Sequence, residues 1–181
     1  MHRAQLIRVV GIRKDSFNTL RREGQLPFHL PRHDGAARWH RFTLDDAFRL
    51  RLQLELMGRG SALEVGSGAL PSFAPKAVAN ALSKRREGLS FDVLRSTPED
   101  LYAGFLVFDE PASPDQDLRR FGWFFGCLED VARWRDGEIE AAEQEWRCRE
   151  ALCSRVVLAN ASAAARHVHR RAVEIGALEE G

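Results

Sequence analysis

The residues of this chain best suited to chemistry lie between Gly11 and Gly24, where cations and small polar side chains crowd one short segment. An arginine or lysine neutralises nucleic-acid phosphates and releases the counterions bound to them. An asparagine amide can bond to N6 and N7 of an adenine at the same time. The candidate DNA contacts in this segment are Arg13, Lys14, Ser16, Asn18, Arg21 and Arg22, and Asn18 is the best suited to read a base.

A second basic group follows between Phe28 and Phe42. The Asp-Gly pair at 34–35 favours a tight turn, and the flanking segments could pair as a β-hairpin with aromatics on one face and cations on the other. We expect this wing to straddle the DNA backbone or enter the minor groove, and its candidate DNA contacts are Arg32, His33, Arg38, His40 and Arg41, of which the arginines would mostly bind phosphate. Any single cation is equally well explained as a solvated surface charge, and it is the clustering that favours DNA.

Short amphipathic helices are expected to position the first basic group. Residues 4–10 form one helical pattern, which Gly11 ends because glycine accepts the left-handed backbone of a helix C-terminus. From 13 to 22 a second pattern places Phe17 and Leu20 on the inner side and the cations outside. Two helices joined at a glycine, the second of them basic, are typical of a helix-turn-helix.

A third helix is expected to begin at Thr43, with Asp45 and Asp46 in its first turn, where carboxylates suit both capping and the helix dipole. Apolar residues recur along it at intervals of three and four, and would pack against the two short helices. Residues 1–58 are therefore expected to form one winged helix-turn-helix DNA-binding domain.

These features together resemble the winged-helix head of the MerR transcriptional regulators, an architecture that phage excisionases share. The resemblance rests on the Gly-Ile turn at 11–12, Arg-Glu-Gly-Gln-Leu-Pro at 22–27 and Arg-Trp-His-Arg-Phe-Thr-Leu-Asp-Asp-Ala at 38–47. It covers about a third of the chain. It implies a protein that binds double-stranded DNA, and we expect a homodimer because two-fold proteins match palindromic sites.

The second helix departs from the family pattern of Thr, Arg, two aromatics and Glu before the Gly. Those places hold Ser16, Asn18, Thr19, Leu20 and Arg21. The chain therefore resembles a divergent MerR-like or phage-type regulator rather than a standard promoter-distorting activator.

Charge divides the chain into two parts. Residues 1–60 carry twelve Lys and Arg against six Asp and Glu, whereas 61–181 carry fifteen against twenty. A basic first third joined to an acidic remainder indicates a nucleic-acid-binding part attached to a part with another role. Gly, Ser, Ala, Leu and Pro dominate 59–73, which we expect to be a linker or irregular connection.

The second part, 74–181, is expected to be an α+β domain for dimerisation, partner contact or effector sensing. Helical patterns cover 75–87, 128–135, 138–152 and a last segment that Asn160 or Ser162 caps and Gly176 ends. Strand-like segments are 89–95, 101–108 and 156–159, with a loop at 109–117, and 121–126 is either a returning antiparallel strand or a helix. The predicted fold class is therefore α+β, with an N-terminal winged helix-turn-helix and a small antiparallel sheet in the C-terminal domain.

Aromatic residues are dense in the second part, where they include Tyr102, Phe105, Phe108, Phe121, Trp123, Phe124, Phe125 and Trp134. Either they form the core of that domain, or they line a sheet face exposed for self-association or for a small-molecule pocket.

No pattern for catalysis or cofactor binding stands out. His167 and His169 project about 200° apart on a helix, which does not suit a shared metal. Cys127, Cys148 and Cys153 lack metal-site spacing and read as thiols of a reducing compartment. We expect a non-enzymatic protein without cofactor or metal. Since there is neither a signal-peptide pattern nor an apolar run of about 18–20 residues, we expect no membrane association and a cytoplasmic location.

The sequence thus predicts a sequence-specific DNA-binding transcriptional regulator of bacterial or phage type. RNA polymerase or another protein is a further partner on this hypothesis. One alternative is an excisionase-type recombination directionality factor, which bends DNA beside an attachment site. The other is a protein-interaction adaptor that uses its winged helix to contact another protein.

Overall fold

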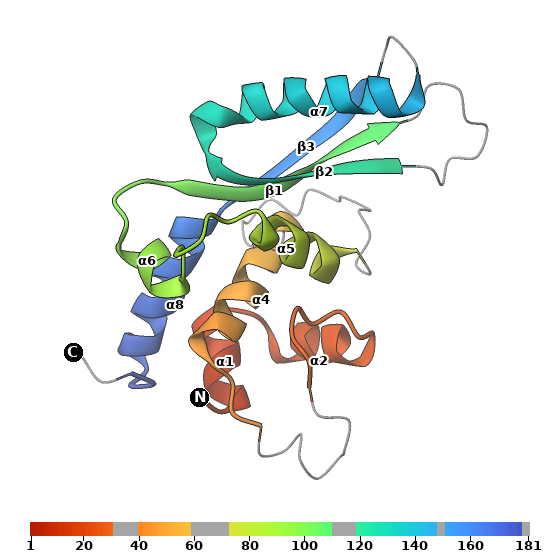
Figure 1. Cartoon of the computed structure of the whole chain (residues 1–181). Coiled ribbons are helices and arrows are strands. Elements are labelled where there is room, and N and C mark those ends of the chain that lie inside the picture. Colours follow the sequence, from red (N-terminus) through yellow and green to blue (C-terminus); the bar gives the residue numbers. More distant parts are fainter. Residues whose placement is uncertain (31–39, 59–72, 110–118, 148–150, 179–181) are drawn as a thin grey trace.

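In a computed structural model the chain forms an α+β fold in three layers, with helix α7 on one face of a three-stranded antiparallel sheet and the other helices on the opposite side (Figure 1). The structure describes residues 1–30, 40–58, 73–109, 119–147 and 151–178. Mixed α and β structure with a small antiparallel sheet is the coarse fold class expected from the sequence, and it is confirmed. None of the described helices is long and apolar enough to cross a membrane.

The first two helices form where the sequence indicates. Helix α1 (Arg3–Val10) ends at Gly11, whose φ of 77° lies in the left-handed region that glycine adopts without strain. Helix α2 (Lys14–Arg22) follows after a short turn and ends before Gly24, which has a φ of 66°. Both glycines therefore terminate helices in the way that the sequence predicts.

Helix α4 (Leu44–Leu56) begins at the expected cap. The Thr43 side chain accepts a hydrogen bond from the backbone N–H of Asp46 at 3.0 Å, and the Asp46 carboxylate accepts one from the backbone N–H of Thr43 at 2.9 Å. Such a capping box satisfies two N–H groups that a helix start leaves unpaired. Immediately before it, Phe42 and Met1 exchange two main-chain hydrogen bonds of 2.8 and 2.9 Å, which tie the start of α4 to the start of α1.

The sheet has the strand order β2-β1-β3, with every neighbour antiparallel. Strand β1 (Leu101–Asp109) lies between β2 (Arg119–Cys127) and β3 (Leu152–Asn160). Gly104 sits in the middle of β1, where a Cβ atom would lie 2.0 Å from the carbonyl oxygen of Val157. The central strand therefore needs glycine at this position so that β3 can approach.

Each face of the sheet carries its own aromatic layer. Helix α7 (Val131–Trp146) covers one face, and α5 (Ala74–Ser83) covers part of the other. The layer under α7 contains Phe108, Phe124, Trp134 and Trp146, whereas the layer against α5 contains Phe73, Phe105, Phe121 and Trp123. Of the aromatic group, Phe105, Phe108 and Phe124 are buried, whereas Tyr102, Phe121, Trp123, Phe125 and Trp134 are half-buried.

The strand predicted at 89–95 is wrong, because this segment contains helix α6 (Phe91–Ser96). The Ser90 hydroxyl caps α6 by accepting a hydrogen bond from a backbone N–H at 3.3 Å. Phe91 and Leu94 are buried. Their spacing of three residues puts both on one helical face, a periodicity that the alternation of apolar residues in the sequence obscured.

Helix α7 joins two segments that the sequence predicted as separate helices, and it ends earlier than expected. The sequence predicted separate helices at 128–135 and 138–152, but a single helix runs through Gly137 and is preceded by a short 3-10 turn. Strand β3 then begins at Leu152 instead of at 156. Helix α5 likewise ends at Ser83, four residues before the predicted end of its pattern.

Helix α8 (Ala161–Glu174) follows β3 directly. Of the two predicted caps, Asn160 is the one that caps it, and its side chain accepts from a backbone N–H at 2.7 Å. It lies beside α1, α4 and α6 on the helical side of the sheet (Figure 1). One hydrophobic core joins these helices across the boundary expected at 59–73, and it includes Leu6, Val9, Leu50, Leu52, Leu94, Ala161 and Val168. The N-terminal helices and the second part therefore share a core.

Candidate nucleic-acid interface

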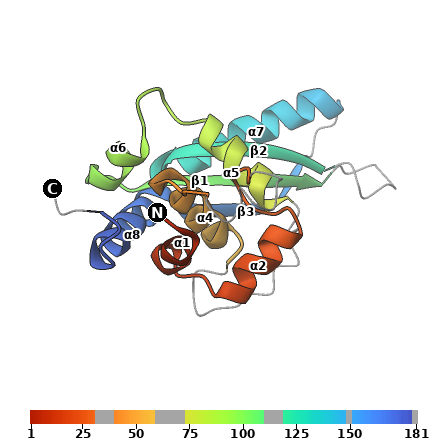
Figure 2. The ribbon, with the colours of Figure 1, turned by 90° about the horizontal axis from the view of Figure 1, so that it is seen from below.

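Helix α2 lies at one side of the helical layer and α8 at the opposite side, with α1 and α4 between them (Figures 1 and 2). Phe17 and Leu20 anchor the inner face of α2, and both are buried. The ring of Phe17 meets that of Phe42 edge-on, with 6.5 Å between the ring centres. This anchoring confirms the predicted inner face and leaves the cations of α2 on the outside.

The basic residues at the two ends of α2 are exposed: Arg13 and Lys14 at its start, Arg21 and Arg22 at its end. Among the described residues only Arg22 has a carboxylate near it, that of Glu23 at 3.7 Å. Ion pairs between exposed side chains contribute only about 0–1 kcal/mol. The positive charge of α2 is therefore largely available to an external anion.

Asn18 is held inside the protein more firmly than the sequence suggests. Its Oδ1 accepts a hydrogen bond from the guanidinium of Arg3 on α1, and the same guanidinium stands 5.3 Å from the centre of the Phe17 ring. Reading an adenine would use Oδ1 to accept from N6 and the amide NH₂ to donate to N7. Asn18 can therefore read adenine bidentately only after it separates from Arg3. Ser16, the neighbouring polar candidate, is half-buried.

Gln53 on α4 fixes the end of α2, and it was not among the residues selected from the sequence. It is fully buried, and its Nε2 donates to the carbonyl oxygen of Gln25 at 2.8 Å. The N–H of Gln25 in turn donates to the carbonyl oxygen of Leu20 at 2.8 Å. Gln53 thus holds the chain that leaves α2, and the signal that could have revealed it is a lone amide within the leucine stripe of α4.

The second basic group is only partly within the described residues. Arg32, His33 and Arg38 lie outside them, and so does most of the expected wing. Residues 28–30 and 40–42, on either side, form no strand. His40 is half-buried with its ring centre 4.7 Å from that of Phe42, whereas Arg41 is exposed. From this group the structure therefore places only Arg41 where it could contact a phosphate.

Three cations at 84–86 follow α5, and one of them has a local structural role. Arg85 donates from Nε to the carbonyl oxygen of Leu82 at 3.1 Å and from Nη1 to that of Leu89 at 3.3 Å. Leu82 lies in the last turn of α5 and Leu89 just before the cap of α6, so Arg85 links the end of α5 to the chain that follows it. Arg85 therefore stabilises the end of α5.

The α2 surface offers charge and hydrogen-bond donors, which suits binding to a polyanion. Within the described ranges, no three His, Cys, Asp or Glu side chains are grouped so that they could hold a metal ion. Comparison of the chain with models of known protein families, with curated proteins and with solved structures finds no match.

Proposed function

We propose that this protein is a sequence-specific regulator of bacterial or phage type that binds double-stranded DNA through the outer face of α2. The observation that carries the proposal is the polarity of this helix. Its apolar residues Phe17 and Leu20 are buried, while four basic residues at its two ends are exposed. A helix anchored in this way presents its charge outward as a fixed pattern.

The length of α2 agrees with the dimensions of a DNA groove. Nine residues at a rise of 1.5 Å give a helix of about 13 Å, and the major groove is about 12 Å wide. Arg13 and Lys14 at one end and Arg21 and Arg22 at the other can therefore reach phosphates on opposite strands. Ser16 and Asn18 lie between these ends, nearest to the base edges.

Within this proposal, the first 58 residues act as a divergent MerR-like winged helix-turn-helix, and the protein binds as a homodimer. One short reading helix contacts few base pairs, whereas two helices related by two-fold symmetry match a palindromic site. Asn18 reads a base after duplex phosphates draw Arg3 away from its amide. Contact with RNA polymerase or another protein would then turn DNA occupancy into regulation.

The test is to select bound duplexes from a random-sequence pool with the full chain, and then to titrate the selected duplex by fluorescence anisotropy. We expect affinity at least about 1,000-fold above that for a scrambled duplex, and a steep decrease as salt increases. Gel filtration of the complex then gives the stoichiometry. Failure to bind any duplex at low salt would remove the proposal and leave a protein-interaction role for the N-terminal helices.

The excisionase alternative makes a different prediction for the bound DNA. An excisionase-type protein bends DNA, so its complex migrates anomalously when the site is moved along a fragment of constant length. A regulator of transcription instead changes transcript level from a promoter that carries the selected site. These two measurements separate the alternatives once a binding sequence is known.

A further inference from the structure

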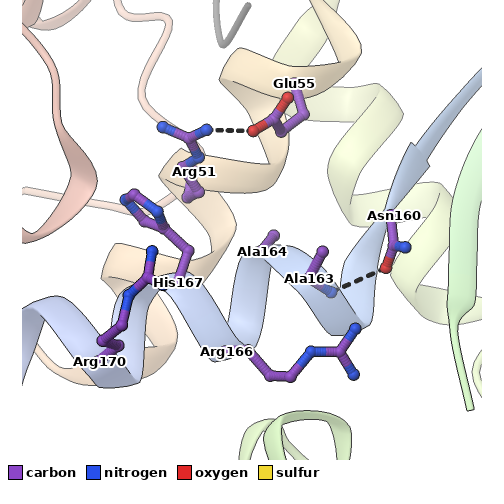
Figure 3. A pocket seen from close by; sticks show the side chains of 8 residues that line it. All are labelled: Arg51, Glu55, Asn160, Ala163, Ala164, Arg166, His167 and Arg170. Atoms are coloured by element: carbon purple, nitrogen blue, oxygen red, sulfur yellow. Dashed lines mark hydrogen bonds and ion pairs between the residues drawn. The ribbon is translucent and has the colours of Figure 1, made fainter. Parts of the chain in front are cut away.

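A basic cavity is lined by side chains from α4 and α8 and from the end of β3 (Figure 3). Its volume is about 600 Å³, which falls in the range of small-molecule sites, about 300–1,000 Å³. The lining residues are Arg51, Glu55, Asn160, Ala163, Ala164, Arg166, His167 and Arg170. The lining thus contains three arginines and one histidine, but a single carboxylate.

Two nitrogen atoms of this lining are enclosed without a hydrogen-bond partner among the described residues. They are Nε of Arg51 and Nε2 of His167. Arg51 uses its other nitrogens on the carbonyl oxygen of Val10, at 3.2 Å, and on the carboxylate of Glu55. An enclosed donor without an acceptor is costly for a fold. Among the described residues, nothing thus accepts a hydrogen bond from Nε of Arg51, although Val10 and Glu55 accept from its other nitrogens.

The side chains that approach Arg51 come from α8. Figure 3 shows His167 and Arg170 reaching from α8 toward Arg51, while the guanidinium of Arg166 turns the other way. Arg166 is held there by hydrogen bonds to the carbonyl oxygen of Thr97, at 3.2 Å, and to the carboxylate of Asp100. Arg51, His167 and Arg170 thus form the group of donors left for a ligand.

Arg170 is the least constrained member of this group. Its side chain is 69% exposed, and its Nε lies 3.8 Å from the carboxylate of Glu174. Arg171, one residue along, bonds to the same carboxylate at 2.6 Å and does not line the cavity. Arg170 can therefore turn into the cavity without leaving Glu174 unpaired.

We propose that the α4–α8 cavity binds a small oxyanion, a phosphate or carboxylate group, through Arg51, His167 and Arg170. Arginine binds both groups through paired hydrogen bonds, and Nε of Arg51 and Nε2 of His167, which are enclosed without a partner in the described part of the chain, can bond to such a ligand once their side chains turn toward it. Glu55 remains paired with Arg51, and its negative charge limits how much negative charge a bound ligand can carry. The proposal does not depend on DNA binding by α2.

Protonation of His167 would be coupled to this binding. Burial lowers the pKa of His167, and the nearby cations Arg51, Arg170 and Arg171 lower it further, whereas Glu55 raises it. A bound anion favours the imidazolium form, so anion affinity increases as pH falls through the pKa of His167. The ring also lies beside Gly11, at 3.9 Å from where a Cβ would be, which places the site against the turn between α1 and α2.

The test is thermal unfolding of the full chain with sodium phosphate, sodium acetate or sodium chloride at matched ionic strength. We expect phosphate or acetate, but not chloride, to raise Tm saturably by about 3 °C, as ligand linkage requires for a site of this kind. A larger rise with phosphate than with acetate identifies a phosphorylated ligand, and the opposite order identifies a carboxylate.

The variants Arg170→Gln and His167→Gln are expected to weaken oxyanion binding at least about tenfold, because each removes a charged or enclosed donor. Arg171→Gln is the matched control: it removes the same charge one residue away and keeps the effect of phosphate. Equal Tm increases in all four proteins would overturn the proposal. So would a tenfold loss of duplex affinity in Arg170→Gln without any effect on phosphate, since the cavity would then be a subsite for DNA.

Discussion

Helices α2 and α8 are both short, basic and amphipathic, yet their cations have different surroundings. On α8, Arg166 bonds to Asp100, and the other two arginines lie within 4 Å of Glu174. On α2, Arg22 has a neighbouring carboxylate at 3.7 Å, and the other cations have none within the described residues. The arginines of α8 therefore stabilise the fold or face the cavity, whereas those of α2 face solvent.

This contrast shows that the type and spacing of cations on a helix do not determine their role. Arg166 and Asp100 are 66 residues apart in the chain, so no local pattern could have paired them. What distinguishes the two helices is whether the fold supplies carboxylates. The α2 cations are our proposed DNA contacts because the fold leaves them available.

The largest expected effect is a difference in DNA affinity between variants of α2 and variants of α8. Replacing Arg13, Lys14 and Arg21 with glutamine should lower duplex affinity at least about 100-fold near 0.1 M salt and reduce the slope of log K against log salt by about 2.7. Replacing all three arginines of α8 should change affinity less than about threefold. Anisotropy titrations measure both, and circular dichroism checks that each variant is folded. Equal losses for the two sets would remove the distinction.

The chain after α2 and helix α8 each depend on one buried polar side chain, and each of these side chains can be removed by a separate substitution. Gln53 holds the chain after α2, and the hydroxyl of Ser162 on α8 accepts from the N–H of Leu101 at 3.0 Å. Gln53→Leu and Ser162→Ala should each cost about 1–3 kcal/mol, since each leaves a buried main-chain group unpaired. Urea unfolding measures this loss. Only Gln53→Leu should also weaken duplex binding, and a similar weakening by Ser162→Ala would contradict the separation.

A smaller effect is expected from the ion pairs themselves. Arg166→Gln should cost about 0.5–1 kcal/mol, because the pair with Asp100 is partly exposed. Arg21→Gln should change stability by less than about 0.5 kcal/mol.

Hydrogen bonds from Arg166 and then Asn160 lower the pKa of Asp100 below 3.8. The stability that the ionised Asp100 carboxylate contributes is therefore fully present above about pH 4 and is lost as pH falls through its lowered pKa. A stability profile between pH 2 and 7 measures it, and an unchanged acid limb in Arg166→Gln would be inconsistent with the pair.

The smallest effect concerns His167, which has no counterpart on α2. Its pKa lies below 6.5, so the unfolded chain binds more protons than the folded one between the two values. Stability should therefore decrease as pH falls from 6.5 through the lowered pKa and then level off. His167→Gln should flatten this region of the profile, and phosphate should restore stability to the original protein. His169→Gln is the control, because His169 does not line the cavity. A flattened stability profile in this variant would contradict the assignment of the effect to His167.

The N-terminal helices could be predicted because their signals are local. Gly11 and Gly24 mark helix ends by backbone conformation, Thr43 and Asp46 form a cap three residues apart, and Phe17 has the helical spacing of a buried residue. Each of these depends on neighbours within about one turn of helix. Strand β1 was found for the same reason, whereas β2 was one of two alternatives for its segment and the cap of α8 one of two candidates.

The errors and omissions come from contacts between distant residues or from ambiguous short segments. The six residues of α6 contain too few turns to show a helical period, and Gly137 continues a helix that packing against the sheet stabilises. The hydrogen bond from Arg3 to Asn18, the anchoring role of Gln53 and the α4–α8 cavity all need the folded chain. The candidate DNA contacts on α2 could thus be selected from the sequence, but the constraint on Asn18 could not.

The most direct test of the central claim is to titrate the isotope-labelled full chain with a mixed-sequence duplex at low salt and to follow backbone amide signals by NMR. We predict that the largest shifts fall on residues 13–23 and on Arg41, with an added shift at Arg3 as it leaves Asn18. Residues 161–174 of α8 should be nearly unaffected. Largest shifts on α8 or on the sheet, or no shifts at equimolar duplex, would contradict the assignment of α2 as the DNA-binding helix.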